Sequence, residues 1–209
     1  MINTILVEDD LYIQKHFAER LKTNEDFRLV GVYRDAFEAE KNCNGSVQLI
    51  LMDVQTQHKH SGLAAAKRIK KVFPDIKIVA VTSLVDPEVL SKAKNGAADS
   101  LWYKDHGTEE LLDVIKRTLD GEKVFPSSSP SVEMEKAMSE DFSPRQLDIL
   151  RLYIRGLTYQ EIADKIGISK NGVRWNLDDM VEKGEFESRE ALVATAIENK
   201  LMVTTLKDE

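Results

Sequence analysis

Residues 47–53 read VQLILMD, an apolar run that closes on an aspartate. A short run that is apolar on both alternate faces is typical of a strand buried on both sides of a parallel sheet. Similar runs recur along the first part of the chain, at residues 4–7, 27–33, 76–82 and 100–103. Segments with helical spacing or helix-capping residues separate them, at residues 11–21, 35–42, 62–73, 86–96 and 108–121.

This alternation predicts an α/β domain in which a five-stranded parallel sheet is doubly wound, with helices on both faces. Residues 126–141, PSSSPSVEMEKAMSED, lack strong periodicity, so we expect a linker there, with one short helix around Met134. Everything after the linker has helical patterning. SPRQ (143–146) and TYQE (158–161) have the pattern of capping boxes, and helices are predicted at 169–183 and 188–201.

The composition is that of an ordinary globular protein, and 209 residues suffice for two domains. The net charge of −7 is shared among residues 1–120, 121–142 and 143–209, so no part of the chain is basic overall. Any affinity for nucleic acid must therefore come from a local basic patch. The start of the sequence lacks the layout of a secretory signal, no apolar run is long enough to span a membrane, and the single cysteine fits a reducing compartment. We expect a cytoplasmic protein.

Polar residues follow the predicted strands at the end where each strand stops. Glu8 and Asp9 come after the first strand, Asp53 ends the third, Thr82 ends the fourth and Lys104 follows the fifth. In an open parallel sheet, binding sites form at the carboxyl ends of the strands. A carboxylate at a strand end is often only a helix cap, but three carboxylates from adjacent strands offer the oxygen ligands that Mg²⁺ prefers.

These residues lie in the motifs LVEDD, LILMD, VTS and WYKD, through which residues 1–121 resemble the receiver domain of two-component response regulators, a flavodoxin-like fold. The resemblance implies that Asp53 takes a phosphoryl group from a partner histidine kinase. It implies a Mg²⁺ ion held by Glu8, Asp9, Asp53 and the backbone carbonyl of Gln55. It also implies that Lys104 and the Thr82 hydroxyl contact the phosphoryl oxygens.

The sequence departs from the receiver pattern in two places. After Asp53 the usual short proline–glycine turn is replaced by VQTQHKHSG, whose His58 and His60 we expect to be exposed to solvent rather than bound to a metal. The position three before Lys104, commonly an aromatic residue, is Leu101. This departure puts an aromatic-rotamer switch in doubt but leaves the phosphorylation chemistry complete.

Residues 143–203 resemble the LuxR-type helix-turn-helix output domain of the NarL/FixJ regulators, so we expect a linker at residues 122–142 and the output domain at residues 143–209. The resemblance is carried by SPRQLDILRLYIRGLTYQEIADKIGISKNGVRWNL and SREALVATAIENKL. It implies that the helix beginning at Lys170 enters the major groove of DNA and that the last helix pairs two output domains. The implied DNA-binding residues are Lys170, Asn171, Arg174, Trp175 and Asp178.

The charge of this segment changes along the chain. Residues 145–174 hold six basic and three acidic side chains, whereas residues 178–190 hold two basic and six acidic ones. Arg174 is suited to a guanine and Trp175 to a thymine methyl group. Asp178 takes a place that is often lysine in the family, so we expect a weaker grip on phosphates unless Asp178 and Asp179 cap a neighbouring helix or pair with Arg189.

We therefore interpret the sequence as a response regulator transcription factor, a phosphoprotein that is not itself an enzyme with its own substrate. Its expected partners are a sensor histidine kinase, promoter DNA and a second copy of the chain on phosphorylation or on DNA, and no membrane. The alternative is a receiver-controlled regulator whose helix-turn-helix binds proteins and no longer binds DNA.

Overall fold

The computed structural model describes residues 1–106 and 110–202, which divide into two compact units. Among the described residues, the first unit contains those of 1–83 and 87–129, and the second contains Leu84–Asp86 and residues 130–202. No helix within the described ranges is long and apolar enough to cross a membrane. Each unit has its own hydrophobic core.

The first unit is the predicted doubly wound α/β fold. All pairings in its sheet are parallel, and the strand order is β2-β1-β3-β4-β5. The strands are β1 (Ile2–Val7), β2 (Phe27–Tyr33), β3 (Leu49–Asp53), β4 (Lys77–Thr82) and β5 (Ser100–Tyr103). The central strand β3 is buried along its whole length, as its apolar sequence predicts.

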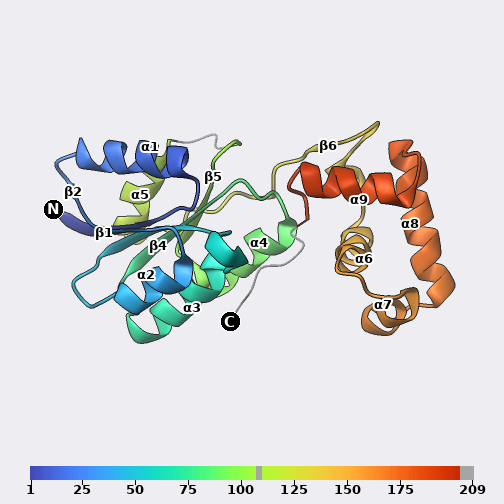
Figure 1. Ribbon diagram of the computed structural model, residues 1–209, viewed down its shortest axis with the longest axis horizontal. Coiled ribbons are helices and arrows are strands. Elements are labelled where there is room, and N and C mark those ends of the chain that lie inside the picture. Colours follow the sequence, from blue (N-terminus) through green and yellow to red (C-terminus); the bar gives the residue numbers. More distant parts are fainter. Residues whose placement is uncertain (107–109, 203–209) are drawn as a thin grey trace. The chain divides into compact units, whose positions relative to one another are not determined.

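Helices cover both faces of this sheet (Figure 1). On one face lie α1 (Leu11–Lys22) and α5 (Leu111–Leu119), whose Phe17 and Ile115 pack in one core with Leu49 and Leu51 of β3. On the other face lie α2 (Ala36–Asn42), α3 (Gly62–Val72) and α4 (Pro87–Lys92). A π-helical turn, Ala93–Ala97, extends α4 to Gly96, whose positive φ of 93° ends the helix.

The second unit is built around four helices, α6 (Pro144–Ile154), α7 (Tyr159–Ile166), α8 (Lys170–Gly184) and α9 (Arg189–Glu198). Both predicted capping boxes are formed, by Ser143 with Gln146 at α6 and by Thr158 with Glu161 at α7. Gly167 then takes the left-handed conformation that closes α7 before Ser169 caps α8. The helix-turn-helix thus follows from local capping signals.

The prediction of a short helix around Met134 is wrong. Glu133–Met134 and Ala137–Met138 form a small antiparallel hairpin, β6 and β7, followed by a single 3-10 turn at Ser139–Asp141. Met134 is fully buried in the helical core, and the Lys136 N–H donates to the Gly184 carbonyl. The packing of Met134 and Ala137 into this core overrides a weak local helix signal.

Leu84–Asp86 belongs to the second unit through specific contacts. Val85 is part of its core, and the Val85 N–H donates to the Lys200 carbonyl at 3.0 Å. Asp86 accepts a hydrogen bond from Arg151 at 2.6 Å, and both side chains are buried.

Candidate functional site

The register of the sheet brings the predicted phosphorylation residues to one edge. Asp53 is the last residue of β3 and lies opposite Val81 of β4, so Thr82 lies one position further along the same edge. Glu8 directly follows β1, and Lys104 directly follows β5. The ends of β1, β3, β4 and β5 therefore carry the side chains that the sequence analysis predicted for this site.

Lys104 links two buried carboxylates at this edge. Its Nζ lies 2.9 Å from Asp53 Oδ2 and 2.6 Å from Glu8 Oε2. Asp53 is 5% exposed and Glu8 only 1% exposed, so the three charges are held almost entirely out of water. Asp9, which is half-buried, completes a group of carboxylates whose nearest oxygens lie within 4.8 Å of one another.

The cluster holds three carboxyl groups and one lysine, and this excess of acidic groups shifts the pKa values of its members. Burial raises the pKa of Asp53 well above its usual value and Glu8 raises it further, while Lys104 acts in the opposite direction. Burial and Glu8 also raise the pKa of Asp9. Burial alone would lower the pKa of Lys104, but the charges of Asp53 and Glu8 outweigh burial and raise it.

The donor set fits a divalent cation that prefers oxygen ligands. Three carboxylates converge, and a bound cation would supply the positive charge that one lysine leaves missing. Gln55, the fourth predicted ligand, is exposed, and its backbone N–H donates to Asp53 Oδ1 at 3.2 Å. That hydrogen bond places Gln55 beside Asp53.

The residues after Asp53 form an ordered loop in which the sequence analysis missed several contacts. Thr56 is buried, and its hydroxyl accepts from the Ala36 N–H and donates to the His60 carbonyl. His60 Nδ1 lies 2.6 Å from Asp35 Oδ2, and the imidazole stacks on Phe37 at 4.0 Å between ring centroids.

Only one of the two loop histidines is exposed as predicted. His58 is exposed, but the expectation for His60 is wrong, because its side chain is only 21% exposed. A polar loop sequence gave no sign that an aspartate from the preceding helix cap would be within reach.

Gly62 at the start of α3 is a further residue that the sequence analysis missed. The loop turns back here, with the Gly62 N–H donating to the Val54 carbonyl. A Cβ atom at this position would lie 1.8 Å from the carbonyl oxygen of Asp53. Only glycine therefore allows α3 to begin against the backbone of Asp53.

The predicted switch residues lie deeper in the fold. Thr82 is fully buried, and its carbonyl accepts from the Lys104 N–H at 2.8 Å. Leu101 is also buried, while Trp102 packs edge-on against Phe17. The Leu101 side chain thus belongs to the core, as an aliphatic residue at this position should.

The predicted DNA-binding residues share a different surface, on helix α8. All five are exposed, namely Lys170, Asn171, Arg174, Trp175 and Asp178, and Trp175 is 65% exposed. The opposite side of the helix supplies Val173, Leu177 and Met180 to the core. Trp175 therefore lies outside the core.

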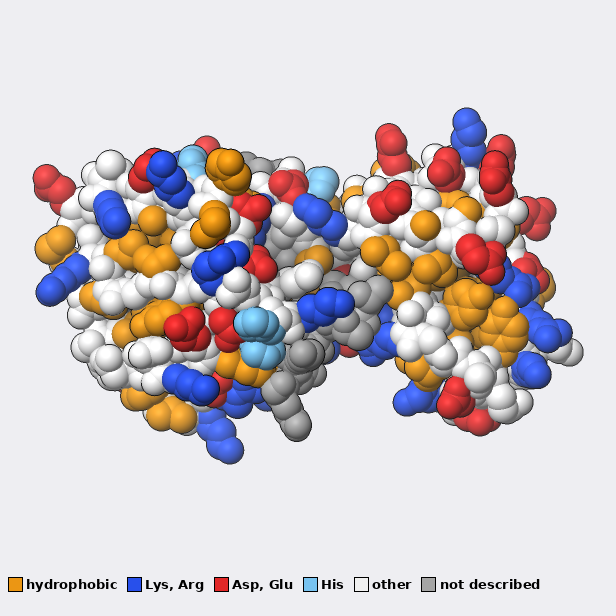
Figure 2. Space-filling model, in the orientation of Figure 1, with side chains coloured by type: hydrophobic (Ala, Val, Ile, Leu, Met, Phe, Trp, Pro, Cys, Tyr) orange, Lys and Arg blue, Asp and Glu red, His pale blue; other side chains and the backbone are white. Residues whose placement is uncertain are grey.

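The charge of this unit is divided as the sequence predicts. In Figure 2 acidic side chains gather along the upper edge, over α9 and the end of α8, and basic side chains lie beside the earlier part of α8. Asp178 pairs with Arg189, and Asp179 pairs with Lys183 at 2.8 Å and with Gln146 at 2.6 Å. Both aspartate side chains are thus paired with neighbouring side chains.

Comparison with known families agrees with this geometry. The sequence model of the response regulator receiver domain matches residues 4–116. The model of bacterial regulatory proteins of the luxR family matches residues 140–196. The chain belongs to the response regulators. It combines a receiver domain with a LuxR-type DNA-binding domain.

Relatives of this response regulator match it over most of its length. It is 27% identical to the response regulator protein VraR of Staphylococcus epidermidis over 96% of this chain and 99% of the relative, and VraR of Staphylococcus saprophyticus gives the same values. Among solved structures, RcsB of Salmonella enterica serovar Typhimurium bound to a promoter has 21% identity and a TM-score of 0.59, covering 93% of this chain and 98% of that one. A structure of two RcsB dimers bound to two parallel DNAs has 21% identity and a TM-score of 0.60, covering 94% and 98%. At this identity the structural likeness shows the fold.

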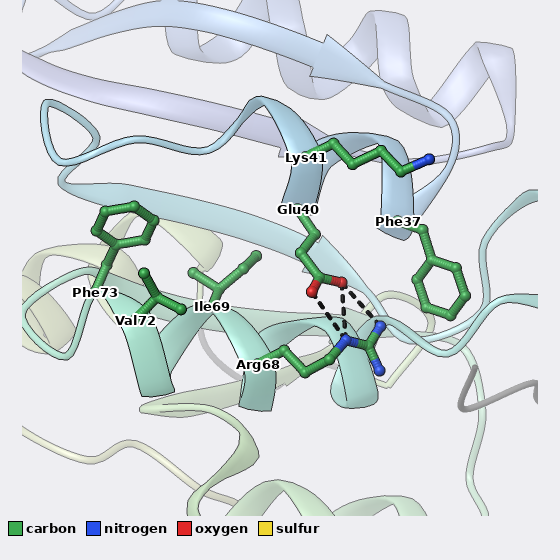
Figure 3. A pocket seen from close by; sticks show the side chains of 7 residues that line it. All are labelled: Phe37, Glu40, Lys41, Arg68, Ile69, Val72 and Phe73. Atoms are coloured by element: carbon green, nitrogen blue, oxygen red, sulfur yellow. Dashed lines mark hydrogen bonds and ion pairs between the residues drawn. The ribbon is translucent and has the colours of Figure 1, made fainter.

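The response regulator also has a shallow groove away from these residues. The groove runs between α2 and α3, where Arg68 Nη2 forms an ion pair with Glu40 Oε2 at 2.8 Å (Figure 3). Apolar side chains, among them Phe37, Val72 and Phe73, form much of the remaining lining. None of the predicted phosphorylation or DNA-binding residues lines this groove.

Proposed function

We propose that a partner histidine kinase phosphorylates this regulator on Asp53, and that phosphorylation controls dimerisation and sequence-specific binding to promoter DNA. The proposed receiver is residues 1–121, the linker 122–142 and the DNA-binding domain 143–209. The observation that carries the first half is the convergence of Glu8, Asp53 and Lys104 at one edge of the sheet. The regulator is proposed to work in the cytoplasm, where a lone cysteine stays reduced.

Each side chain of the cluster has a chemical task in this proposal. Asp53 is the nucleophile, and its carboxylate attacks the phosphorus while the bond to the kinase histidine breaks. Mg²⁺, held by Glu8, Asp9 and Asp53 with the Gln55 carbonyl, would offset the negative charge of the phosphoryl group. Lys104 turns from the two carboxylates to the new phosphoryl oxygens, and the Thr82 hydroxyl donates to one of them.

A direct experiment tests the phosphorylation site. The full chain is incubated with acetyl phosphate, with and without Mg²⁺, and the intact mass is measured. We expect the phosphoryl adduct only with Mg²⁺ and its loss in Asp53→Asn. Asp99→Asn is the matched control, because Asp99 is another buried carboxylate of the same unit but pairs with Lys70. An adduct that persists in Asp53→Asn, or that disappears in Asp99→Asn under conditions where this variant is folded, contradicts the assignment.

The link to dimerisation is tested through Lys104. Lys104→Ala should retain part of the phosphate uptake but lose the response to it, because the contact that reports the phosphoryl group is gone. Sedimentation with and without beryllofluoride measures the response. Equal dimerisation in Lys104→Ala and the parent would show that the signal does not pass through this lysine.

The second half of the proposal rests on the exposed face of α8. Arg174 has the geometry to donate two hydrogen bonds to a guanine, and Trp175 presents apolar area beside it. A random duplex library selected with the phosphorylated protein identifies a preferred site. Arg174→Ala should then weaken binding by roughly 1–3 kcal/mol and relax specificity at one base pair. Failure to enrich any sequence would favour the protein-interaction alternative.

A further inference from the structure

Three helices meet around a single tyrosine on the proposed DNA-binding face. Tyr159 is the first residue of α7, and its half-buried ring lies between side chains of α8 and α9. The guanidinium of Arg174 lies over this ring, 5.5 Å from its centroid. The Tyr159 hydroxyl accepts a hydrogen bond from Arg189 Nη1 at 2.6 Å.

Arg189 is in turn held by Asp178. Its Nε donates to Asp178 Oδ1 at 2.9 Å, and its Nη2 donates to the same oxygen. Asp178 lies one helical turn after Arg174, so the contacts form a chain from Asp178 through Arg189 and Tyr159 back to Arg174. Every link is a hydrogen bond, an ion pair or a cation–π contact between side chains of different helices.

Such a chain has a physical use at a recognition surface. An arginine on an exposed helix face samples many rotamers, and ordering it on binding lowers affinity. A ring that already carries the guanidinium removes part of that loss before DNA arrives. The ring can do so only if its own position is fixed, and here the hydroxyl is fixed by Arg189.

Asp178 then differs from an isolated acidic residue near DNA. Its charge is paired with the charge of Arg189, so the two together present little net field to a phosphate. We propose that Asp178 is a positioning residue that acts through Arg189 and Tyr159 to orient Arg174 for base recognition. This inference rests on the proposed function, and it predicts an effect on sequence preference where simple repulsion predicts an effect on all DNA alike.

Two substitutions separate positioning from charge. Tyr159→Phe removes one hydroxyl, keeps the ring and changes no charge. Asp178→Asn removes the ion pair and keeps the shape. The probes are the duplex selected by the parent protein and a scrambled duplex of equal length, with affinities measured by fluorescence anisotropy at one salt concentration. Asp179→Asn is the matched control, since the next residue of the helix pairs with Lys183 and Gln146.

We expect both substitutions to lower the preference for the selected duplex by about two- to fivefold, which is the range of an exposed cation–π contact. Asp179→Asn should leave the preference unchanged. In an Arg174→Ala background neither Tyr159→Phe nor Asp178→Asn should lower it further, because the residue they orient is gone. An equal gain in affinity for both duplexes on Asp178→Asn, with no change on Tyr159→Phe, would overturn the inference and leave repulsion as the explanation.

A measurement without DNA keeps this inference distinct from the proposed function. The NMR order parameter of Arg174 Nε in the free protein should fall in Tyr159→Phe and in Asp178→Asn but not in Asp179→Asn. Unchanged order in the first two variants refutes the positioning role even if DNA binding is intact. A parent protein that prefers no duplex refutes the proposed function, and the role in base recognition with it.

Discussion

Replacing Asp53 with asparagine should stabilise the receiver when no divalent cation is bound. Asparagine keeps the shape of the side chain and removes one negative charge from a cluster that holds Glu8, Asp9 and Lys104. The Glu8–Lys104 ion pair remains in the variant. The sign of the effect depends on whether the attraction of Lys104 stabilises the ionised Asp53 by more than burial and repulsion destabilise it.

The structure allows the size of each effect to be worked out. Unit charges at the 2.9 Å between Lys104 and Asp53 attract by about 6 kcal/mol at an effective dielectric constant of about 20. Unit charges at 4.8 Å, the outer limit for the carboxylate oxygens, repel by about 3.5 kcal/mol. Both Glu8 and Asp9 repel Asp53 in this way, so the summed repulsion of about 7 kcal/mol cancels the attraction to Lys104, and the desolvation penalty of several kcal/mol for a buried ion is left unopposed. We expect Asp53→Asn to raise the free energy of unfolding by about 1–3 kcal/mol at neutral pH.

The raised pKa of Asp53 also makes the stability of the receiver depend on pH. Because the pKa of Asp53 is raised in the folded state, the folded protein binds this proton more readily than the unfolded chain does. Ionisation of Asp53 therefore removes stability as the pH rises from the usual value, 3.8, through the raised pKa. The parent protein in EDTA should lose this stability with rising pH, and Asp53→Asn should not show that loss.

Urea unfolding measured by tryptophan fluorescence provides the assay. The chain has two tryptophans, so a Trp175→Phe background leaves Trp102 of β5 as the reporter of the receiver. Mg²⁺ at about a hundred times its Kd should add about 2.7 kcal/mol to the parent and much less to Asp53→Asn. Asp99→Asn is again the control, and it should destabilise the receiver because Asp99 accepts from both Lys70 and the Ile78 N–H. A loss of stability in Asp53→Asn in EDTA would refute the argument that burial dominates.

Three further substitutions test the local packing. Gly62→Ala should cost at least about 3 kcal/mol in thermal unfolding, because its Cβ would lie 1.8 Å from the Asp53 carbonyl oxygen. Glu185→Gly should add about 1 kcal/mol to the urea stability of the second unit, since Glu185 has a φ of 55° at the end of α8. Gln146→Ala should cost about 1–3 kcal/mol in the same assay, because the buried amide closes a capping box and donates to Asp179 at 2.6 Å.

Each of these three has a contrary outcome. Unchanged melting of Gly62→Ala would mean that the loop after Asp53 can relax without loss of stability. Destabilisation by Glu185→Gly would show that the glutamate side chain contributes more than the left-handed backbone costs. A neutral Gln146→Ala would mean that water replaces both of its hydrogen bonds.

The sheet, and the edge that Asp53, Thr82 and Lys104 share, could be predicted from the sequence because both depend on the backbone. A parallel sheet fixes which residues share an edge once the strands are assigned, and strands as apolar as β3 are easily assigned. Asp53, Thr82 and Lys104 therefore meet without any knowledge of side-chain packing. The helix ends of the second unit were predictable for a similar reason, since capping boxes are local.

Contacts between distant side chains were out of reach from one sequence. The pair of His60 with Asp35 depends on how the loop folds back over α2, and the loop sequence is only polar. The hairpin around Met134 forms because Met134 packs into the core between the helices, and the sequence alone does not show how those helices are spaced. Both errors arose where the final structure is decided by packing between elements rather than within one.

The two proposed sites differ in the same way, and this difference sets how each should respond to mutation. The Asp53 cluster is built from residues that end neighbouring strands, so a change of side chain there alters charge while the backbone geometry stays in place. The α8 surface is built from side chains that hold one another, from Asp178 through Arg189 to Tyr159 and Arg174. A change at Asp178 is therefore transmitted, and its effect on DNA cannot be estimated from its own charge. In the proposed role, Asp178, which looks unfavourable beside a phosphate in the sequence, helps to orient Arg174 toward a base through Arg189 and Tyr159.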